Sequence, residues 1–144
     1  VRIDNNLIVN GEVCFNGVCI TGQDLIDIKS KLGELNESVN SVNGGILPLA
    51  SGISHYESSY GKAEYYKVSN IVYVNGLIKG TSGKTHLATL PSGFTPNKRL
   101  IFIMNNHSGS YRLDVLKNGK IMWVTGSRSH NWLSISGINF YVNN

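Results

Sequence analysis

Residues that could carry acid–base, nucleophilic or metal chemistry are few and scattered along this chain. Only Glu64 and Asp114 are acidic after residue 60, so a carboxylate pair for glycoside cleavage would need these two to meet across the fold. The four histidines show neither HxH nor HExxH spacing. Ser82, in Gly-Thr-Ser-Gly, lacks the strand-to-helix context of a nucleophile elbow. We therefore expect no enzyme activity, no metal and no cofactor.

The two cysteines flank the dipeptide Asn16-Gly17, which is typical of a two-residue β-hairpin turn. In such a hairpin Cys14 lies opposite Cys19 in a non-hydrogen-bonded pair, where the Cα atoms come closest. This spacing permits a disulfide, although it lies near the low end of the usual range. Two free thiols are the alternative. A zinc site is not expected, because zinc prefers four ligands and the pair offers two.

A second Asn-Gly dipeptide, Asn118-Gly119, predicts another hairpin with a two-residue loop. In that register Asp114 pairs with Trp123, and Arg112 pairs with Thr125. The alternation predicts an apolar core side made of Tyr111, Leu113, Val115, Met122 and Val124. It places on the other side Arg112, Asp114, Trp123, Leu116 and Ile121.

The polar side of this hairpin combines an indole, a carboxylate and a guanidinium. Such a group offers a stacking platform with directional hydrogen-bond partners, which suits a sugar ring or a planar anionic group. We therefore predict a binding site at Trp123, Asp114 and Arg112. The alternative is that Trp123 is buried between subunits, and the site then moves to the loops around His107 and Arg128.

The elements that must position these residues begin with a helix whose apolar residues recur at alternating steps of three and four. An isolated helix of this length is marginal in water, and so narrow a stripe is typical of a coiled-coil seam. Leu at a with Ile at d favours more than two strands, and no Asn interrupts the seam, so we expect a homotrimer. The alternative is a single amphipathic helix docked on the following domain. The predicted a and d residues are Leu25, Ile28, Leu32, Leu35, Val39 and Val42.

Charge divides the chain near residue 60. Before it, three basic side chains face seven acidic ones, a net charge of −4; after it, ten face two, a net charge of +8. The basic part favours anionic partners such as acidic glycans or teichoic-acid-like polymers, and nucleic acid is a less expected partner. No apolar run is long enough to span a membrane, so no membrane insertion is expected. Because the chain begins at Val1 rather than Met, we expect a fragment or processed product.

From residue 62 onward the pattern has period two, β-forming residues and closely spaced turn signals. It predicts a mainly β fold, an antiparallel β-sandwich with jelly-roll-like connectivity. The chain would then consist of an N-terminal β segment (1–21), a coiled-coil stalk (22–43), a connector (44–60) and the sandwich head (61–144). The eight expected strands are 65–68, 71–78, 85–90, 99–105, 111–117, 120–125, 131–136 and 137–142.

Several blocks in the head carry a family resemblance. They are YKVSNIVYVNGLI at 66–78, ATLPSGFTP at 88–96, RLDV at 112–115, NG at 118–119 and WLSISGINF at 132–140. Over residues 60–142 the chain resembles the C-terminal domain of viral fibre proteins, which occurs in phage tail fibres and in fibres of large DNA viruses. The chain departs from the family pattern at Thr95, where Arg is expected. The segment CFNGVCIT at 14–21 resembles the short β elements that precede coiled coils in giant and algal virus fibres.

The resemblance implies a virion-associated, extracellular homotrimeric fibre whose tip contacts the host cell, with a surface glycan or anionic polymer as receptor. On this interpretation the receptor-binding residues are Trp123, Asp114 and Arg112, with His107 and Arg128 nearby. Linking three weak sites can raise avidity by about 10² to 10⁴ without any new contact. Two other functions stay open: a structural or trimerisation module of a fibre, and a secreted trimeric β-sandwich ligand of the complement-like or cytokine-like type.

Overall fold

The structure is a computed structural model that describes residues 11–40 and 42–143. The side chains of residue 15 and residues 38–40 lie outside this description. The chain forms two compact units, Val1–Ser41 and Val42–Asn144. The second unit, hereafter the head, therefore begins well before the boundary expected near residue 61. Of the β segment predicted at 1–21, residues 1–10 lie outside the described residues.

The first unit begins with a hairpin of β1 (Glu12–Phe15) and β2 (Val18–Thr21). Asn16 and Gly17 both have positive φ angles, 49° and 79°, as a type I′ turn requires. Cys14 therefore lies opposite Cys19, in the register expected from the turn. The two sulfurs form a disulfide, with the Cα atoms 3.9 Å apart.

The helix α1 (Gly22–Asn40) follows the hairpin directly. Its first turn is closed by a reciprocal capping arrangement. The Asp24 N–H donates to the Thr21 hydroxyl at 3.1 Å, and the Thr21 N–H donates to the Asp24 carboxylate at 2.8 Å. Hydrogen bonds from the Thr21 hydroxyl and backbone lower the pKa of Asp24. The start of the helix is thus defined by local sequence alone.

Four of the predicted seam residues, Leu25, Ile28, Leu32 and Leu35, lie on this helix with 48–61% of their surface exposed. Val39 also lies on α1, but its side chain is outside the described part. Val42 was wrongly assigned to the seam, because the helix ends at Asn40. The chain after it forms β3 (Asn43–Ile46), which pairs with β5 (Glu64–Val68) instead of continuing the helix.

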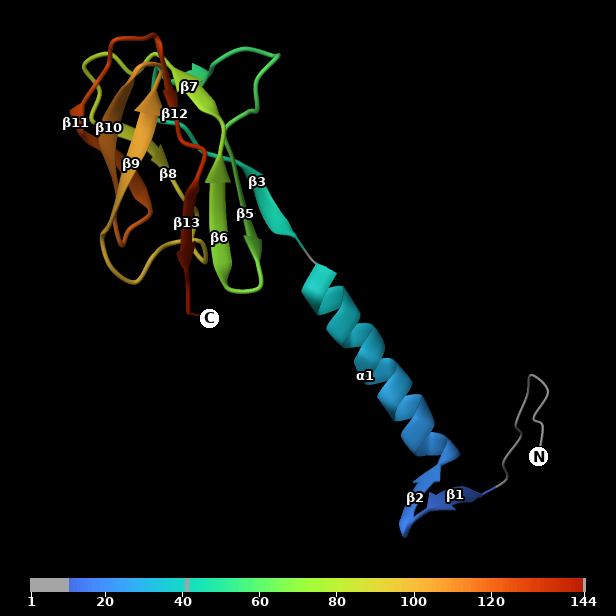
Figure 1. The fold of residues 1–144 in the computed structure, drawn as a ribbon. Helices are drawn as coiled ribbons and strands as arrows, with labels where there is room; N and C mark the ends of the chain where they lie inside the picture. The colour runs from blue at the N-terminus through green and yellow to red at the C-terminus, as the bar shows by residue number, and fades with distance from the viewer. Residues whose placement is uncertain (1–10, 41, 144) are drawn as a thin grey trace. The chain divides into compact units, whose positions relative to one another are not determined.

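The first sheet of the head has the strand order β8-β11-β10-β9 (Figure 1). Three consecutive strands lie side by side, and β8 returns beside β11, which is the order of a Greek key. A jelly roll contains two Greek keys, and its complete connectivity stays a prediction. The strands are β8 (His86–Thr89), β9 (Leu100–Asn106), β10 (Gly109–Val115) and β11 (Lys120–Gly126).

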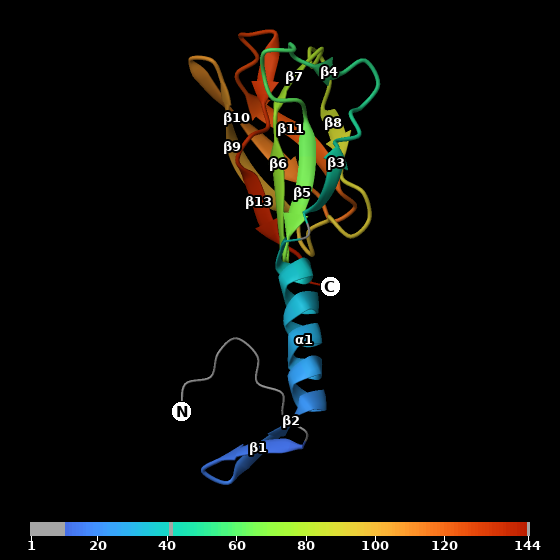
Figure 2. The same cartoon turned by 90° about the vertical axis from the view of Figure 1, so that its right-hand side faces the viewer.

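The second layer of the sandwich consists of two sheets that share chain segments, with the orders β13-β6-β5-β3 and β12-β7-β4 (Figure 2). A single residue, Gly76, separates β6 from β7, so one path through the layer contributes to both sheets. The further strands are β4 (Ser54–His55), β5 (Glu64–Val68), β6 (Ile71–Asn75), β7 (Leu77–Lys79), β12 (Trp132–Ser134) and β13 (Ile138–Tyr141).

The core lies between these layers, where alternate residues of each strand point inward. The most fully buried side chains include Val72, Val74, Ile78, Leu87, Leu113, Ile121, Leu133 and Ile138. One buried polar contact crosses the layers, because the Tyr111 hydroxyl donates to the backbone oxygen of Ser134 at 2.8 Å. Burial raises the pKa of this phenol. The mainly β, antiparallel class expected from the sequence is therefore present.

The connector predicted at 44–60 is wrong, since it contains β3 and β4 and contributes the buried residues Leu47 and Ile53 to the core. Gly44, in β3, lies tightly against β5. A Cβ atom there would lie 2.3 Å from the Tyr65 oxygen. The absence of a side chain at Gly44 thus allows β3 and β5 to lie close together.

The register predicted for the second hairpin is also wrong. Its loop has three residues, because the Leu116 N–H donates to the Lys120 oxygen. Leu113 consequently pairs with Trp123 and Asp114 with Met122, each one residue away from the predicted partner. A bulge at Val124 absorbs the shift, so Arg112 still pairs with Thr125. Ile121 therefore enters the core in place of Met122.

Gly76 provides a test of this architecture. Its φ is +120°, and a Cβ atom there would lie 2.3 Å from the Lys62 oxygen. We expect Gly76→Ala to lower the free energy of unfolding by about 2 kcal/mol, through backbone strain and steric overlap. Urea unfolding monitored by tryptophan fluorescence measures this, because both tryptophans lie in the head. Gly61→Ala is the control, since no atom lies within 4 Å of a Cβ at that residue. Equal effects of both substitutions would contradict the prediction.

Candidate functional site

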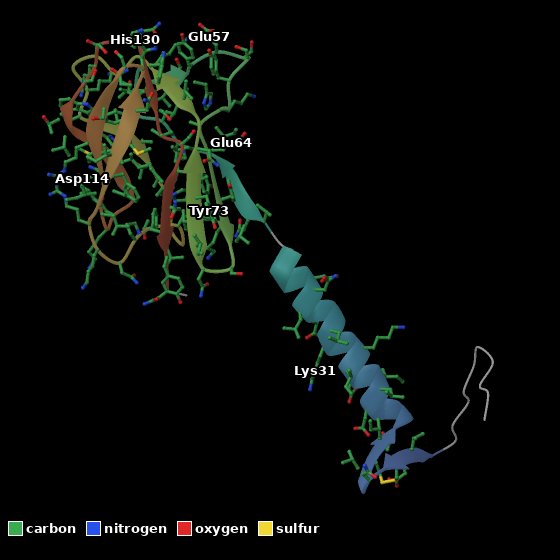
Figure 3. All side chains as sticks on the ribbon, in the orientation of Figure 1. Lys31, Glu57, Glu64, Tyr73, Asp114 and His130 are labelled. Carbon is green, nitrogen blue, oxygen red and sulfur yellow. A yellow bond between two sulfur atoms is a disulfide. The ribbon has the colours of Figure 1, made fainter. Side chains whose placement is uncertain are left out.

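The predicted site residues Trp123, Asp114 and Arg112 do not all come together, and the alternative residues His107 and Arg128 belong to different groups. Figure 3 shows Asp114 beside the β9-β10-β11 sheet, whereas His130, next to the predicted His107, lies at the end of the head where β9 ends and β12 begins. Arg112 contacts Asp114, and Arg128 contacts Trp123. His107 lies apart from both pairs and stacks on His130. The shifted hairpin register explains the separation of Trp123 from Asp114, because it places their side chains on opposite faces of the sheet.

Asp114 is fully buried under two arginines on the outer side of the first sheet. The Arg112 Nε lies 2.8 Å from one carboxylate oxygen, and Arg99 contacts the other. Hydrogen bonds from Arg112 lower the pKa of Asp114, and those from Arg99 lower it further. Burial of the carboxylate acts in the opposite direction, but the pKa stays below its ordinary value. The same pairing raises the pKa of Arg112. These groups satisfy one another, so they are suited to holding the sheet rather than a ligand.

Trp123 lies on the core side of β11 and packs against the buried cluster. The guanidinium carbon of Arg128 lies 3.8 Å from the centre of its ring. Arg128 also donates to the backbone oxygens of Thr81 and Lys84. Burial lowers the pKa of Arg128. The pair therefore anchors the loop at 80–85 to the loop at 127–131, and Trp123 is not an open stacking platform.

Five aromatic rings gather where β9 ends and β12 begins. The rings of His107 and His130 stack with centroids 3.9 Å apart, and each lies about 6 Å from Trp132, at 6.2 Å and 6.1 Å. Tyr56 lies 6.4 Å from Trp132 and 5.3 Å from Tyr60. We call Tyr56, Tyr60, His107, His130 and Trp132 the aromatic cluster. Tyr60, His107 and His130 are exposed.

The aromatic cluster borders a hollow of about 310 Å³, hereafter the aromatic hollow. Leu77 contributes an apolar side chain, while Asn105 and Ser134 contribute an amide and a hydroxyl. None of the residues that line it carries a formal charge at neutral pH when His107 is neutral. Its lining consists of Tyr60, Leu77, Asn105, His107, Trp132 and Ser134.

The buried side chain of Asn106, at the end of β9, holds this region together. Its amide donates to the Trp132 backbone oxygen. Its side-chain oxygen accepts from the Ser127 hydroxyl at 2.9 Å and from the His130 N–H at 3.4 Å. His107, the next residue, has a φ of 58° and turns the chain sharply away from the strand. One buried amide thus bonds the backbone of both His130 and Trp132.

Two other hollows lie in the head. One of about 180 Å³ adjoins the aromatic cluster on the far side of His130 and is lined by Gly80, Thr81, Ser82, Arg128, His130 and Asn131. The other, about 380 Å³, lies along β3 and β5 and is lined mainly by backbone, two tyrosines and aliphatic side chains, with Glu64 as its one charged residue. It therefore lacks the convergent polar groups of a ligand site.

Sequence reasoning found two residues of this end of the head, His107 and Arg128, and missed Tyr60, Asn105 and His130. Trp132 was noted only as part of the WLSISGINF block. A usable signal was the polar and aromatic stretch Ser129-His130-Asn131-Trp132, which directly precedes a strand. Loops that follow a rigid strand are common places for binding residues.

A metal site finds little support among the described residues. The one group of three potential ligands there is Glu12, Cys14 and Cys19, and the two sulfurs are bonded to each other. In the same part of the chain no helix is long and apolar enough to cross a membrane.

The fold is a mainly β head of antiparallel sheets, accompanied by a helical unit. A similar solved structure is the crystal structure of the receptor binding protein (gp15) of Listeria phage PSA. The TM-score is 0.67 at 20% sequence identity, over 85% of this chain and 77% of that chain. Because the head spans residues 42–144, a match of this extent includes part of the first unit. No family model matches the sequence, and no curated protein matches it.

The ion cluster at Asp114 gives a pH-dependent prediction. A carboxylate whose pKa is lowered in the folded state stabilises the protein above its ordinary pKa, and this stabilisation is lost as the pH falls through the lowered value. We expect Asp114→Asn to reduce the free energy of unfolding by about 2 kcal/mol at pH 7, because it leaves two arginines unpaired, one of them well solvated. The difference from the unmodified protein should shrink below about pH 4.

Urea unfolding between pH 2.5 and pH 7, followed by tryptophan fluorescence, measures this difference. Glu64→Gln is the control, because Glu64 is an exposed carboxylate on β5. If the difference in the free energy of unfolding between Asp114→Asn and the unmodified protein does not change with pH, the ion cluster does not contribute as described.

Proposed function

We propose that this chain is a receptor-binding tip of a viral fibre, extracellular on the virion, which attaches to a host-surface glycan through the aromatic cluster and not by catalysis. The fold similarity to a phage receptor binding protein supports this proposal. The aromatic hollow carries it, because it combines an indole, a phenol and an imidazole with an amide and a hydroxyl. These are groups that stack on a sugar ring and bond its hydroxyls.

The chemistry of the hollow favours a neutral sugar ring over an anionic group. Arg128 lines the neighbouring hollow and not the aromatic hollow, and its guanidinium already donates to two backbone oxygens. The net charge of +8 after residue 60 would then raise the rate of association with an anionic cell surface, without contributing to recognition of the bound sugar ring.

A trimer supported by α1 fits this function. Four apolar side chains along one stripe of the helix are about half exposed or more in the single chain, which is costly unless partner helices cover them. Three tips on one stalk allow weak individual sites to act together. Two other functions belong to the same architecture, a structural module that only trimerises a fibre and a secreted trimeric ligand. The aromatic hollow favours attachment over both, because neither needs such a site.

The attachment site is tested by a matched pair of tyrosine substitutions. Tyr60 is 50% exposed and lines the aromatic hollow, whereas Tyr141 is 61% exposed and lies on β13 away from it. We expect Tyr60→Ala to weaken binding to a neutral glycan by about fivefold, since one stacking ring contributes about 1 kcal/mol. Tyr141→Ala should leave binding unchanged. A glycan array followed by calorimetry on the best ligand, and adsorption to host cells, provide the two measurements.

Equal binding by both variants would remove the aromatic hollow from the site. Binding to anionic polymers alone, with a steep dependence on salt, would instead assign attachment to the basic surface. No binding to any host cell, with the trimer intact, would favour the structural module.

The trimer is tested at the seam. Light scattering of the unmodified protein should give three times the mass of one chain at micromolar concentration. Leu32→Lys places a charge in the seam and should yield monomers, whereas Ser30→Lys, on the outer face of α1, should leave the trimer intact. A monomeric unmodified protein would contradict the seam assignment and the avidity argument.

A further inference from the structure

The strand β3 lies at one end of the order β13-β6-β5-β3, and among the described strands none pairs with its outer edge. All four of its residues are exposed. Edge strands are usually blunted by a lysine, a proline or a bulge, and β3 has none of these. It runs in regular register from Asn43 opposite Lys67 to Ile46 opposite Glu64. The backbone groups of this edge are therefore open to another chain.

The head covers one of its other sheet edges with a segment of chain, whereas the outer edges of β3 and β9 have no described strand beside them. The outer side of β8 is occupied by residues 48–50. The Thr89 N–H donates to the Pro48 oxygen, and the Ala50 N–H donates to the Leu87 oxygen, each at 2.9 Å. No comparable segment of the described head lies along β3.

Apolar side chains frame this bare edge. Val42 and Ile46 are 65% and 52% exposed, and both line the hollow of about 380 Å³ beside β5. Between them, Gly44 and Gly45 expose backbone, and the Tyr65 hydroxyl would lie only 3.4 Å from a Cβ on Gly45. Glu64 is the one charged residue in the lining. The surface is shaped to receive an aliphatic side chain and an extended backbone.

Chain connectivity determines which molecule reaches this edge. Helices in a coiled coil lie 8–10 Å apart, and Val42 follows the last residue of α1 by two positions. Two residues span about 7 Å at most, so the Val42 residues of associated chains stay within about 25 Å of one another. Whatever the orientation of each head, the start of β3 is held near the same segment of a second copy.

We infer that the β3 edge, with Val42, Ile46 and the adjoining hollow, is an interface between copies of this chain, which continues the contact of the α1 seam into the heads. This inference rests on the trimeric stalk of the proposed function. Neighbouring heads then lie in contact at β3. This packed interface sets the distance between the aromatic hollows of one trimer.

Cysteine cross-linking tests this interface. The two native cysteines are joined to each other, so one added cysteine is the single free thiol. We expect Ile46→Cys, under mild oxidation at dilute protein, to form a dimer band on a non-reducing gel that disappears on reduction. One chain of each trimer must stay unlinked, because a single thiol joins only two chains. Ile103→Cys is the control, since Ile103 is 71% exposed but lies on β9.

A second pair of variants measures the strength of the contact. We expect Ile46→Lys to raise the trimer dissociation constant at least tenfold, and Ile103→Lys to leave it unchanged, as followed by sedimentation. Tryptophan fluorescence confirms that each head stays folded. No cross-link at Ile46, or a stronger one at Ile103, would overturn the inference.

These outcomes are distinguishable from failure of the proposed function. A trimer that adsorbs to host cells without any Ile46 cross-link refutes the β3 interface alone. A cross-linked trimer that binds no glycan and no cell refutes attachment and leaves the interface standing.

Discussion

The head depends on two layers of sheet, each with one apolar face, because each apolar face is covered mainly by the other layer. Val72, Val74 and Ile138 on one layer meet Leu113, Ile121 and Leu87 on the other. Near the aromatic cluster, two buried polar contacts among the described residues join the layers: the Tyr111 hydroxyl and the Asn106 amide both donate to backbone oxygens of β12. The aromatic cluster is therefore carried on strands whose positions are set by the core.

Local sequence was sufficient where nothing else touches the chain. Asn16-Gly17 produced the expected hairpin, and Thr21 with Asp24 capped α1. Among the described residues, no atom lies within 4 Å of a Cβ built on Gly17. The same dipeptide at Asn118-Gly119 gave a longer loop. There the Gly119 oxygen accepts from the Leu90 N–H, and a Cβ on Gly119 would lie 2.4 Å from the Leu90 oxygen. A tertiary contact decided the loop, and a single dipeptide could not indicate it.

The candidate site was less predictable than the strands for the same reason. Alternation along β9, β10 and β11 identified strands correctly, but a shift of one residue moves every side chain to the opposite face. Trp123 and Asp114 were thus expected together and are separated by the sheet. The aromatic cluster draws on residues 56–60, 105–107 and 130–134, segments that only the folded topology brings together.

The way Arg128 anchors its neighbouring loop has a consequence for sequence variation in that loop. The guanidinium binds the backbone oxygens of Thr81 and Lys84, and these oxygens are present whatever the side chains are. The identity of residues 81–84 can therefore change with little effect on the anchor itself. A head built in this way can change the side chains of this loop while the supporting scaffold stays the same.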